Sequence, residues 1–255
     1  MNFMSFMSLL SQLTVGLGRT LLVFLFTLLF SLPLGLLVTF GRMSKWAPFA
    51  FLKRSEDSEA VVSHPKLLQR MLAGLRNFLI RLKPLQLLVK FFISILRGTP
   101  LMLQIIVVFF APFYVFGITL SGSYRFTAVI IAFSVNYAAY FAEIFRSGIE
   151  SIPVGQYEAA QVLGYNKSQT FFKIIFPQMV KRVVPPVTNE VITLVKDTSL
   201  AFVILYTEMF TVAKQIAAAK TTIMPLFVAG VFYFIFNAVV AYAMERIERG
   251  LAYYQ

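Results

Sequence analysis

Polar side chains that could bind a solute lie inside strongly apolar stretches of this chain, where burying an ionised or amide group is costly. The candidates are Gln104, Asn136, Tyr140, Glu143, Asp197 and Thr198. Asn136, Tyr140 and Glu143 fall on one face of a helix because of their spacing. A carboxylate such as Asp197 can bind a cation, whereas amide and hydroxyl groups can donate hydrogen bonds to an anion. The pattern predicts a polar path through an apolar protein.

Each candidate also has a structural interpretation. Asp197 can be neutralised by the adjacent Lys196 or by a basic residue of another helix, and Glu143 can pair with Arg146 near the cytoplasmic end of its helix. Glu143 with Asp197 or Ser199 is the best candidate for a catalytic set, but it lacks a recognisable general base and the residue spacing of a known catalytic motif. We therefore predict no catalytic residue.

Several classes of site are excluded by residue types that the chain lacks. It has no Cys and a single histidine, His64, which excludes thiolate nucleophiles, Cys-ligated metal sites and His-based metal clusters. It also lacks the Gly-x-x-x-x-Gly-Lys-Ser/Thr loop that cradles the phosphates of ATP. We expect neither a metal ion nor a cofactor in this chain.

The composition is typical of a membrane protein. Hydrophobic residues make up 58% of the chain, with 28 Phe and a mean hydropathy of +0.77, which leaves too few polar residues to cover a globule. A membrane-crossing helix needs about 20 mostly apolar residues. The qualifying stretches are 15–40, 85–116, 126–149, 187–210 and 224–244. We expect an all-α integral membrane fold with about five transmembrane helices in a single domain, residues 1–255.

Positive charge gathers between the apolar stretches. The chain has 23 Lys and Arg against 11 Asp and Glu, a net charge of +12 that in a soluble protein would suggest a nucleic-acid partner. Here loops 41–84 and 151–186 are rich in basic residues, while connections 117–124 and 211–223 are poor in them. Because basic loops stay in the cytoplasm, an odd number of spans puts the N-terminus outside and the C-terminus inside. We expect contacts with membrane lipid and no nucleic-acid binding.

Residues 53–83 form an insertion between the first two apolar stretches. Pro65 opens a helical pattern with leucines on one face, while Lys66, Arg70 and Arg76 lie mainly around the other. Such an amphipathic helix can lie on the membrane surface or pack on the cytoplasmic side of the protein. The sequence leaves both alternatives open.

A helix-breaking run, Arg97-Gly98-Thr99-Pro100, interrupts the second apolar stretch. Proline removes one backbone hydrogen bond, and at membrane depth the freed carbonyl needs a neighbouring helix, a side chain or water as its partner. A broken helix of this kind often borders a translocation path, and a packing kink beside small residues is the simpler alternative.

Segment 151–182 is predicted to form two short helices joined by a tight turn. The first ends at Gly164, because glycine adopts the left-handed conformation that follows a helix at little cost. Asn166 and Gln169 resemble a capping box at the start of the second, and Pro177 ends its apolar run. The small side chains before the turn leave a nearly flat face that can enter a groove on a partner. Because this loop is basic, the hairpin should face the cytoplasm.

The same segment resembles the EAA signature of ABC-importer permeases. The matching residues are Glu158-Ala159-Ala160, Gly164, Ile174 and Pro177, with Phe176 in place of the usual Leu. Runs 97–101 with Gln104, 142–149 and 196–200 are similar to the polar amino-acid branch of that family. The resemblance covers about residues 96–253, and the insertion 53–83 is longer than that branch leads one to expect.

The resemblance implies a permease subunit that moves a polar or charged amino acid across the cytoplasmic membrane of a prokaryote. ATPase subunits, which bind ATP and Mg²⁺, would dock on the hairpin, and a second permease subunit and an external solute-binding protein would complete the complex. The residues implied in ATPase coupling are Glu158, Ala159, Ala160, Leu163 and Gly164. Asp197 could then hold the α-ammonium group of the amino acid. The identity of the amino acid, and whether the second permease is identical, stay open.

Other classes of function are a secondary transporter or channel, a membrane-embedded enzyme and a membrane scaffold. A secondary transporter is expected to show an internal repeat or a proton-relay pair, and neither is clear in the sequence. The enzyme lacks a recognisable catalytic set, and a scaffold would not need so organised a hairpin. Small residues that mark candidate close contacts for a dimer are Gly35, Ala138, Ala139 and Gly230.

Overall fold

The computed structural model describes residues 3–44 and 83–251, which form helices joined by short connections, with no strand among them. The predicted insertion 53–83 lies almost entirely outside the described residues. The elements are α1 (Phe3–Met43), α3 (Pro84–Gly98), α4 (Leu101–Phe116), α5 (Tyr124–Glu150), α6 (Val154–Val162), α7 (Lys167–Thr170), η3 (Phe171–Ile175), α8 (Phe176–Asp197), η4 (Thr198–Ile204), α9 (Met209–Lys220) and α10 (Met224–Leu251). Of these, η3 is a π-helix and η4 a 3-10 helix.

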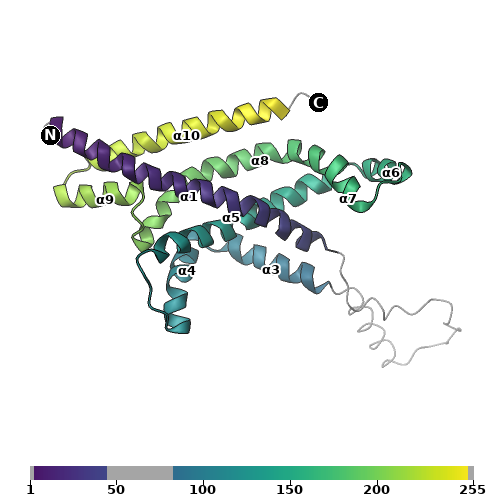
Figure 1. The fold of residues 1–255 in the computed structure, drawn as a ribbon, viewed down its shortest axis with the longest axis horizontal. Helices are drawn as coiled ribbons and strands as arrows, with labels where there is room; N and C mark the ends of the chain where they lie inside the picture. The colour runs from purple at the N-terminus through teal and green to yellow at the C-terminus, as the bar shows by residue number, and fades with distance from the viewer. Residues whose placement is uncertain (1–2, 45–82, 252–255) are drawn as a thin grey trace.

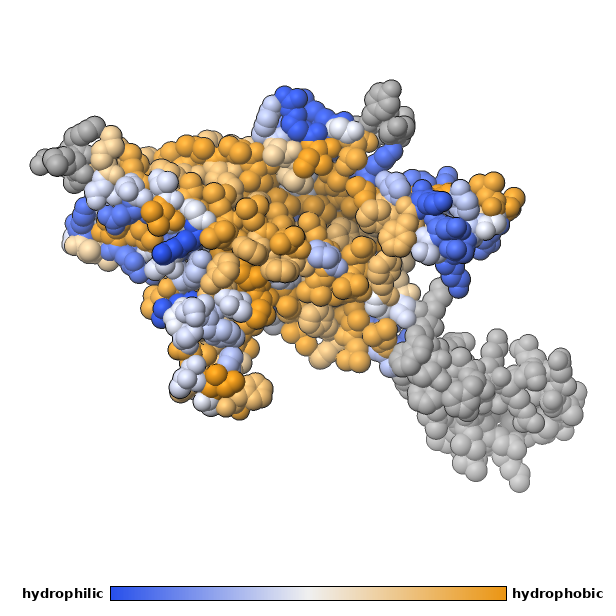
Figure 2. Space-filling model, in the orientation of Figure 1, coloured by the Kyte–Doolittle hydropathy of each residue, from blue (hydrophilic) through white to orange (hydrophobic). Residues whose placement is uncertain are grey.

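The bundle is elongated, with short helices at its two ends. In Figure 1, α1 runs along much of the molecule and crosses α5, against which it packs extensively. The α6–α7 hairpin projects at one end, while α9 lies at the other end beside the start of α1 (Figure 1). Figure 2 shows apolar residues covering most of the surface between more polar ends. This distribution is the one that a lipid bilayer requires.

Three helices are each long and apolar enough to cross a membrane, namely α5, α10 and α1 from Phe6 to Met43. Two further pairs pass the same test but are bent, α3 with α4 by 109° and the segment Lys167–Ile204 with α9 by 54°. If each bent pair counts as one span, the described residues contain up to five. The prediction of an all-α membrane fold with about five spans is confirmed.

The second predicted span, residues 85–116, is two helices rather than one. α3 ends at Gly98 and α4 begins at Leu101, because Thr99 and Pro100 both have extended backbone conformations. A residue before proline is disfavoured in the helical region, and proline cannot donate a backbone hydrogen bond. The predicted helix break is confirmed, and its bend of 109° is far sharper than a packing kink.

The fourth predicted span, residues 187–210, also has different bounds. α8 begins at Phe176, continues the path of α7 and η3, and ends at Asp197. Pro177, predicted to end an apolar run, instead lies inside this helical path, directly after the π-helical stretch in which the Phe176 N–H donates to the Phe171 carbonyl. The chain continues through η4 and leaves it at Leu205, which has a φ of 57°.

The core is built around α5, which α1 approaches closely. At Gly35 an added Cβ would lie 2.8 Å from the Cβ of Phe141 and 3.2 Å from the carbonyl oxygen of Ala138, so only glycine fits this crossing. Gly35 and Ala138 therefore contact each other within the chain, whereas a Cβ at Gly230 would meet nothing within 4 Å. The close crossing fixes the helix on which much of the candidate site is built.

Candidate functional site

The break between α3 and α4 is held by two amide side chains. The carbonyl oxygen of Leu96 accepts hydrogen bonds from Gln104 Nε2 at 2.9 Å and from Asn136 Nδ2 at 3.1 Å. Asn136 Nδ2 also donates to Gln104 Oε1 at 3.0 Å, and Gln104 Nε2 donates to Thr99 Oγ1 at 2.9 Å. Because Pro100 cannot donate to Leu96, the side chains supply the partners that the freed carbonyl was predicted to need.

A pocket of about 400 Å³ lies beside this break, and we call it the break pocket. It is lined by residues of α3, α4, α5 and α8 and of the break itself, namely Arg97, Gly98, Thr99, Pro100, Leu101, Asn136, Tyr137, Tyr140, Glu190, Thr193 and Asp197. A second pocket of about 460 Å³, the basic pocket, shares Arg97, Tyr140 and Glu190 with it and reaches Arg146 and Arg182. The two pockets therefore adjoin along these three shared side chains.

The break pocket brings groups of both charges together. Arg97 lies over the ring of Tyr140, with 5.1 Å between the guanidinium carbon and the ring centroid. Asp197 Oδ2 accepts a hydrogen bond from the hydroxyl of Tyr137 at 2.7 Å, which orients that carboxylate. Glu190 lies about two turns before Asp197 on α8 and lines the same pocket. A guanidinium and carboxylates around one pocket can bind a solute that carries both charges.

The predicted path residues fall into two groups. Asn136, Tyr140 and Asp197 line the break pocket. Gln104 and Thr198 do not line it: the Gln104 amide is bonded into the helix break, and the fully buried Thr198 hydroxyl donates to a carbonyl of α8 at 2.7 Å. These two side chains therefore support the walls of the pocket from behind.

Two residues of the pocket were missed as path residues by sequence reasoning. Glu190 obeys the same rule that selected Asp197, since it is a carboxylate inside a predicted span, and its spacing of about two turns puts both on one face. Arg97 was noticed only as part of the helix-breaking run. The sequence shows Arg97 only as a charge at the helix break. The structure shows that Arg97 lies over Tyr140 and lines the pocket together with Glu190 and Asp197.

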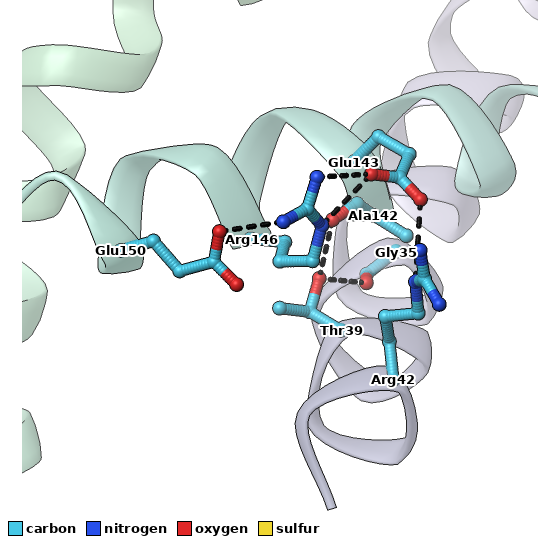
Figure 3. A network of polar contacts seen from close by, with 7 residues as sticks. All are labelled: Gly35, Thr39, Arg42, Ala142, Glu143, Arg146 and Glu150. Carbon is cyan, nitrogen blue, oxygen red and sulfur yellow. Dashed lines mark hydrogen bonds and ion pairs between the residues drawn. The ribbon is translucent and has the colours of Figure 1, made fainter. Parts of the chain in front are cut away.

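At the edge of the basic pocket, which Glu143 and Arg146 line, a network of ion pairs joins α1 to the end of α5 (Figure 3). Glu143 Oε1 lies 3.4 Å from Arg42 Nε of α1, and Glu143 Oε2 accepts from Arg146 Nε at 2.8 Å. Arg146 also pairs with Glu150 at 2.5 Å. We call these four residues the clasp. The predicted alternative for Glu143, an ion pair with Arg146, is confirmed.

The hairpin of α6 and α7 is stabilised by local hydrogen bonds. Gly164 has a φ of 73°, and its N–H donates to the carbonyl of Gln161 at 2.9 Å. Asn166 Oδ1 accepts from the Gln169 N–H at 2.9 Å, and Gln169 Oε1 accepts from the Asn166 N–H at 3.0 Å. The predicted glycine turn and capping box are both confirmed.

The hairpin exposes apolar side chains at the end of the molecule. Val154 and Leu163 are each 69% exposed and Val162 is 87% exposed. Glu158 and Ala159 are exposed as well, whereas Ala160 is fully buried, so the two alanines do not form one flat outer face. An exposed apolar cluster on a folded helix is typical of a surface that another protein covers.

Comparison with known proteins assigns the family. Residues 71–253 match the family described as "Binding-protein-dependent transport system inner membrane component". The L-cystine transport system permease protein TcyB of Bacillus subtilis (strain 168) is 37% identical over 176 residues, which are 68% of this chain and 74% of TcyB. The arginine transport system permease protein ArtQ of the same organism is 34% identical over 170 residues, 66% of this chain and 76% of ArtQ.

Solved structures agree on the fold. A crystal structure described as an amino acid ABC transporter with histidines superposes with a TM-score of 0.74 at 24% identity, covering 98% of each chain. An inward-facing structure of the MetNI methionine ABC transporter gives a TM-score of 0.63 at 18% identity over 98% of this chain and 99% of its own. The chain belongs to the family of inner membrane components of binding-protein-dependent transport systems, the permeases of ABC transporters.

Proposed function

We propose that this chain is the permease subunit of an ABC importer that moves a polar or charged amino acid across the cytoplasmic membrane of a prokaryote. The observation that carries the proposal is the break pocket, which places Arg97 near Glu190 and Asp197 within an apolar bundle. A free amino acid carries an α-carboxylate and an α-ammonium group and thus needs partners of both signs. The permeases TcyB and ArtQ, which this chain resembles, are named for cystine and arginine transport.

Within the break pocket, each charged group of a bound amino acid has a partner of opposite charge. Arg97 can bind the α-carboxylate by two parallel hydrogen bonds, and Asp197 can bind the α-ammonium through the oxygen that Tyr137 leaves free. Asn136 and Tyr140 add polar lining beside them. Glu190 lines both pockets, so it can contact the amino acid in the break pocket and on its way toward Arg182.

The hairpin is the proposed docking element for an ATPase subunit. Its exposed Val162 and Leu163 flank the glycine turn and offer an apolar patch to a groove on the partner. Glu158, Ala159 and Gly164 form the rest of the proposed contact, and Ala160 supports it from inside. ATP and Mg²⁺ would bind to the ATPase, whose closure would rock the spans and switch the cavity between outward and inward access.

The proposed assembly has a second permease subunit, either a copy of this chain or a paralogue, and an external solute-binding protein. In this arrangement the hairpin and the C-terminus face the cytoplasm, and the N-terminus and α9 face outward. The support is the concentration of Lys and Arg in loop 151–186 and the placement of α9 at the end opposite to the hairpin (Figure 1).

The test is purification of the chain from its native membrane in mild detergent, with mass spectrometry of every protein that accompanies it. The complex is then reconstituted in liposomes, and uptake of labelled amino acids is measured with and without ATP. Copurification of an ATPase with a phosphate-binding loop, together with ATP-dependent uptake, supports the proposal. A chain that comes out alone and moves solute without ATP is a secondary transporter, and the importer proposal then fails.

A further inference from the structure

The long helix α1 touches both ends of the molecule, although it contributes no residue to the break pocket or the basic pocket. In Figure 1 it extends from the neighbourhood of α9 to the side of the bundle from which the hairpin projects. A helix of this length, Phe3–Met43, spans roughly 60 Å. Its contacts toward the two ends of the molecule determine whether a movement at one end can reach the other.

At the hairpin end, α1 is joined to both α5 and the hairpin. The rings of Phe40 and Phe171 pack edge to face with centroids 5.2 Å apart, which links α1 to the segment that follows α7. Arg42 pairs with Glu143 of the clasp at 3.4 Å, and Thr39 Oγ1 donates to the carbonyl of Ala142 at 3.0 Å (Figure 3). These contacts join the end of α1 to α5 and to η3, the segment into which the hairpin continues.

At the opposite end, α1 is joined to the start of α9. Thr20 Oγ1 accepts a hydrogen bond from the N–H of Met209 at 3.2 Å, and Arg19 donates to the carbonyl of Thr207 at 3.0 Å. At Gly16 an added Cβ would lie 2.7 Å from the Cα of Met209, so any side chain there would push the two segments apart. This junction is held as closely as the crossing at the other end.

Between these junctions α1 packs against α5 with little freedom to slide. The contact at Gly35 is too close for a methyl group, and the rings of Phe26 and Phe126 pack edge to face at 5.8 Å. Close-packed contacts of this kind shift as rigid bodies rather than deform continuously. A displacement at the hairpin end would thus reach α9 with little loss.

On the basis of the proposed function, we propose that α1 is a strut that carries ATPase-driven movement of the hairpin to the outer end of the subunit. Arg42 and Glu143 are positioning residues that fasten its hairpin end, and Arg19 and Thr20, about four turns after Phe3, fasten it to the start of α9. Closure of the ATPases would then move the start of α9 through α1, while α5 and α8 move the walls of the two pockets. The consequence is tight coupling between ATP hydrolysis and outward access.

Arg42 gives the sharpest test because it belongs to the clasp but, unlike Glu143, lines neither pocket. In the reconstituted complex, we expect Arg42→Gln to lower the amount of amino acid transported per ATP hydrolysed by roughly 3-fold or more, while the ATPase rate is retained. Arg42→Lys keeps the positive charge and should restore most of the ratio. Arg249→Gln, which removes the exposed pair with Glu245, is the matched control and should leave the ratio unchanged.

The outer end of the strut should give the same phenotype. Arg19→Gln is expected to lower the ratio as Arg42→Gln does, and the double variant should be no worse than the poorer single variant, because both interrupt one element. If the fold-reductions of the transport-to-ATP ratio in the two single variants multiply in the double variant, the two residues act independently, which would overturn the proposal. So would a parallel fall of uptake and ATPase rate, which indicates a merely structural role.

A cross-link distinguishes a strut, which stays against α5, from a gate that opens at the clasp, because it fixes α1 to α5 instead of only weakening their contact. Since the chain has no Cys, Thr39→Cys with Ala142→Cys introduces one defined pair of buried thiols, which a membrane-permeant oxidant can join as a disulfide. The reduced double variant is the reference for the lost hydrogen bond of Thr39. A strut keeps this contact throughout the cycle, so cross-linked complex should retain its uptake rate. Loss of uptake that a reductant reverses would show that α1 and α5 separate in each cycle, and the strut would be wrong.

The outcomes distinguish this proposal from the proposed function. If the unaltered complex shows no ATP-dependent uptake of any amino acid, the proposed function fails whatever the variants do. If the unaltered complex imports and Arg42→Gln imports with the same ratio at equal abundance in the membrane, the strut alone fails.

Discussion

The hairpin and the break pocket place their polar and apolar groups in opposite ways. The hairpin satisfies its backbone within a few residues, through Gly164 and the capping box of Asn166 and Gln169, and leaves Val162 and Leu163 in solvent. The break pocket instead hides the aromatic ring of Tyr137 and directs charged groups into a hollow. An outward apolar patch suits a large partner, whereas charges gathered around a partly open pocket suit a small ionic solute.

The difference teaches that coupling and binding should be separable by mutation. The hairpin folds by local hydrogen bonds, so a change there affects what docks on it before it affects the bundle. The pocket is assembled from α3, α4, α5 and α8, and a change of one charge there should alter uptake without altering docking.

The largest effect is expected at the glycine turn. Gly164→Val places a β-branched side chain at a φ of 73°, at a cost of about 1 kcal/mol or more, and should distort the turn beside Leu163. We expect loss of ATPase copurification and a fall in uptake of more than roughly 10-fold. Gly164→Asn is the control of similar size, because asparagine tolerates the left-handed region, and it should bind the ATPase. Equal binding by both variants would contradict the docking role.

The next effect is expected in the break pocket. Asp197→Asn removes a charge but keeps the shape, and we expect uptake to fall roughly 10- to 100-fold while the ATPase still copurifies. Tyr137→Phe is the graded control, since it removes only the hydrogen bond at 2.7 Å and leaves the carboxylate charged. It should cost less than Asp197→Asn. Unchanged uptake by an equally abundant Asp197→Asn variant would remove this residue from the path.

A smaller effect is expected on the exposed apolar patch. Leu163→Ser replaces a side chain that is 69% exposed, so the fold should be unaffected, while affinity for the ATPase should fall by roughly 10-fold. Ile223→Ser, at a site 78% exposed at the other end of the molecule, is the matched control and should leave the affinity unchanged. Titration of the purified ATPase into the permease in nanodiscs measures both. Equal affinities would place the docking surface elsewhere.

How much could be predicted from the sequence follows from the same contrast. The features of the hairpin depend on neighbours within about four residues, so the glycine turn and the capping box were predicted at the right positions. The end of the second helix was predicted wrongly, because the helical path continues past Pro177 through the π-helix η3 into α8. Caps and turns can thus be predicted from neighbouring residues, but the point at which a continuous helical path ends cannot.

The residues of the break pocket could be predicted only in part. The rule that ionisable groups inside spans are costly selected Asp197, but the same rule applied to Glu190 was not followed through, and Arg97 was read only as part of the break. Gln104 was selected as a path residue and instead bonds to Leu96, because the sequence does not show which amide faces a freed carbonyl. Partners that lie far apart in the chain are set by the crossing of α5 with its neighbours.

The smallest effect is expected where the hairpin depends on a single cap. Asn166→Ala removes the side-chain acceptor of the Gln169 N–H at 2.9 Å and should destabilise the start of α7 by about 1 kcal/mol. Hydrogen exchange of the α7 amides should then speed up roughly 5-fold, while exchange in α5 stays unchanged. Asn166→Asp keeps an acceptor at the same place and should exchange as the unaltered chain does. If exchange in α5 rises together with that in α7, the hairpin is not a locally folded unit, and the separation of docking from binding would have to be abandoned.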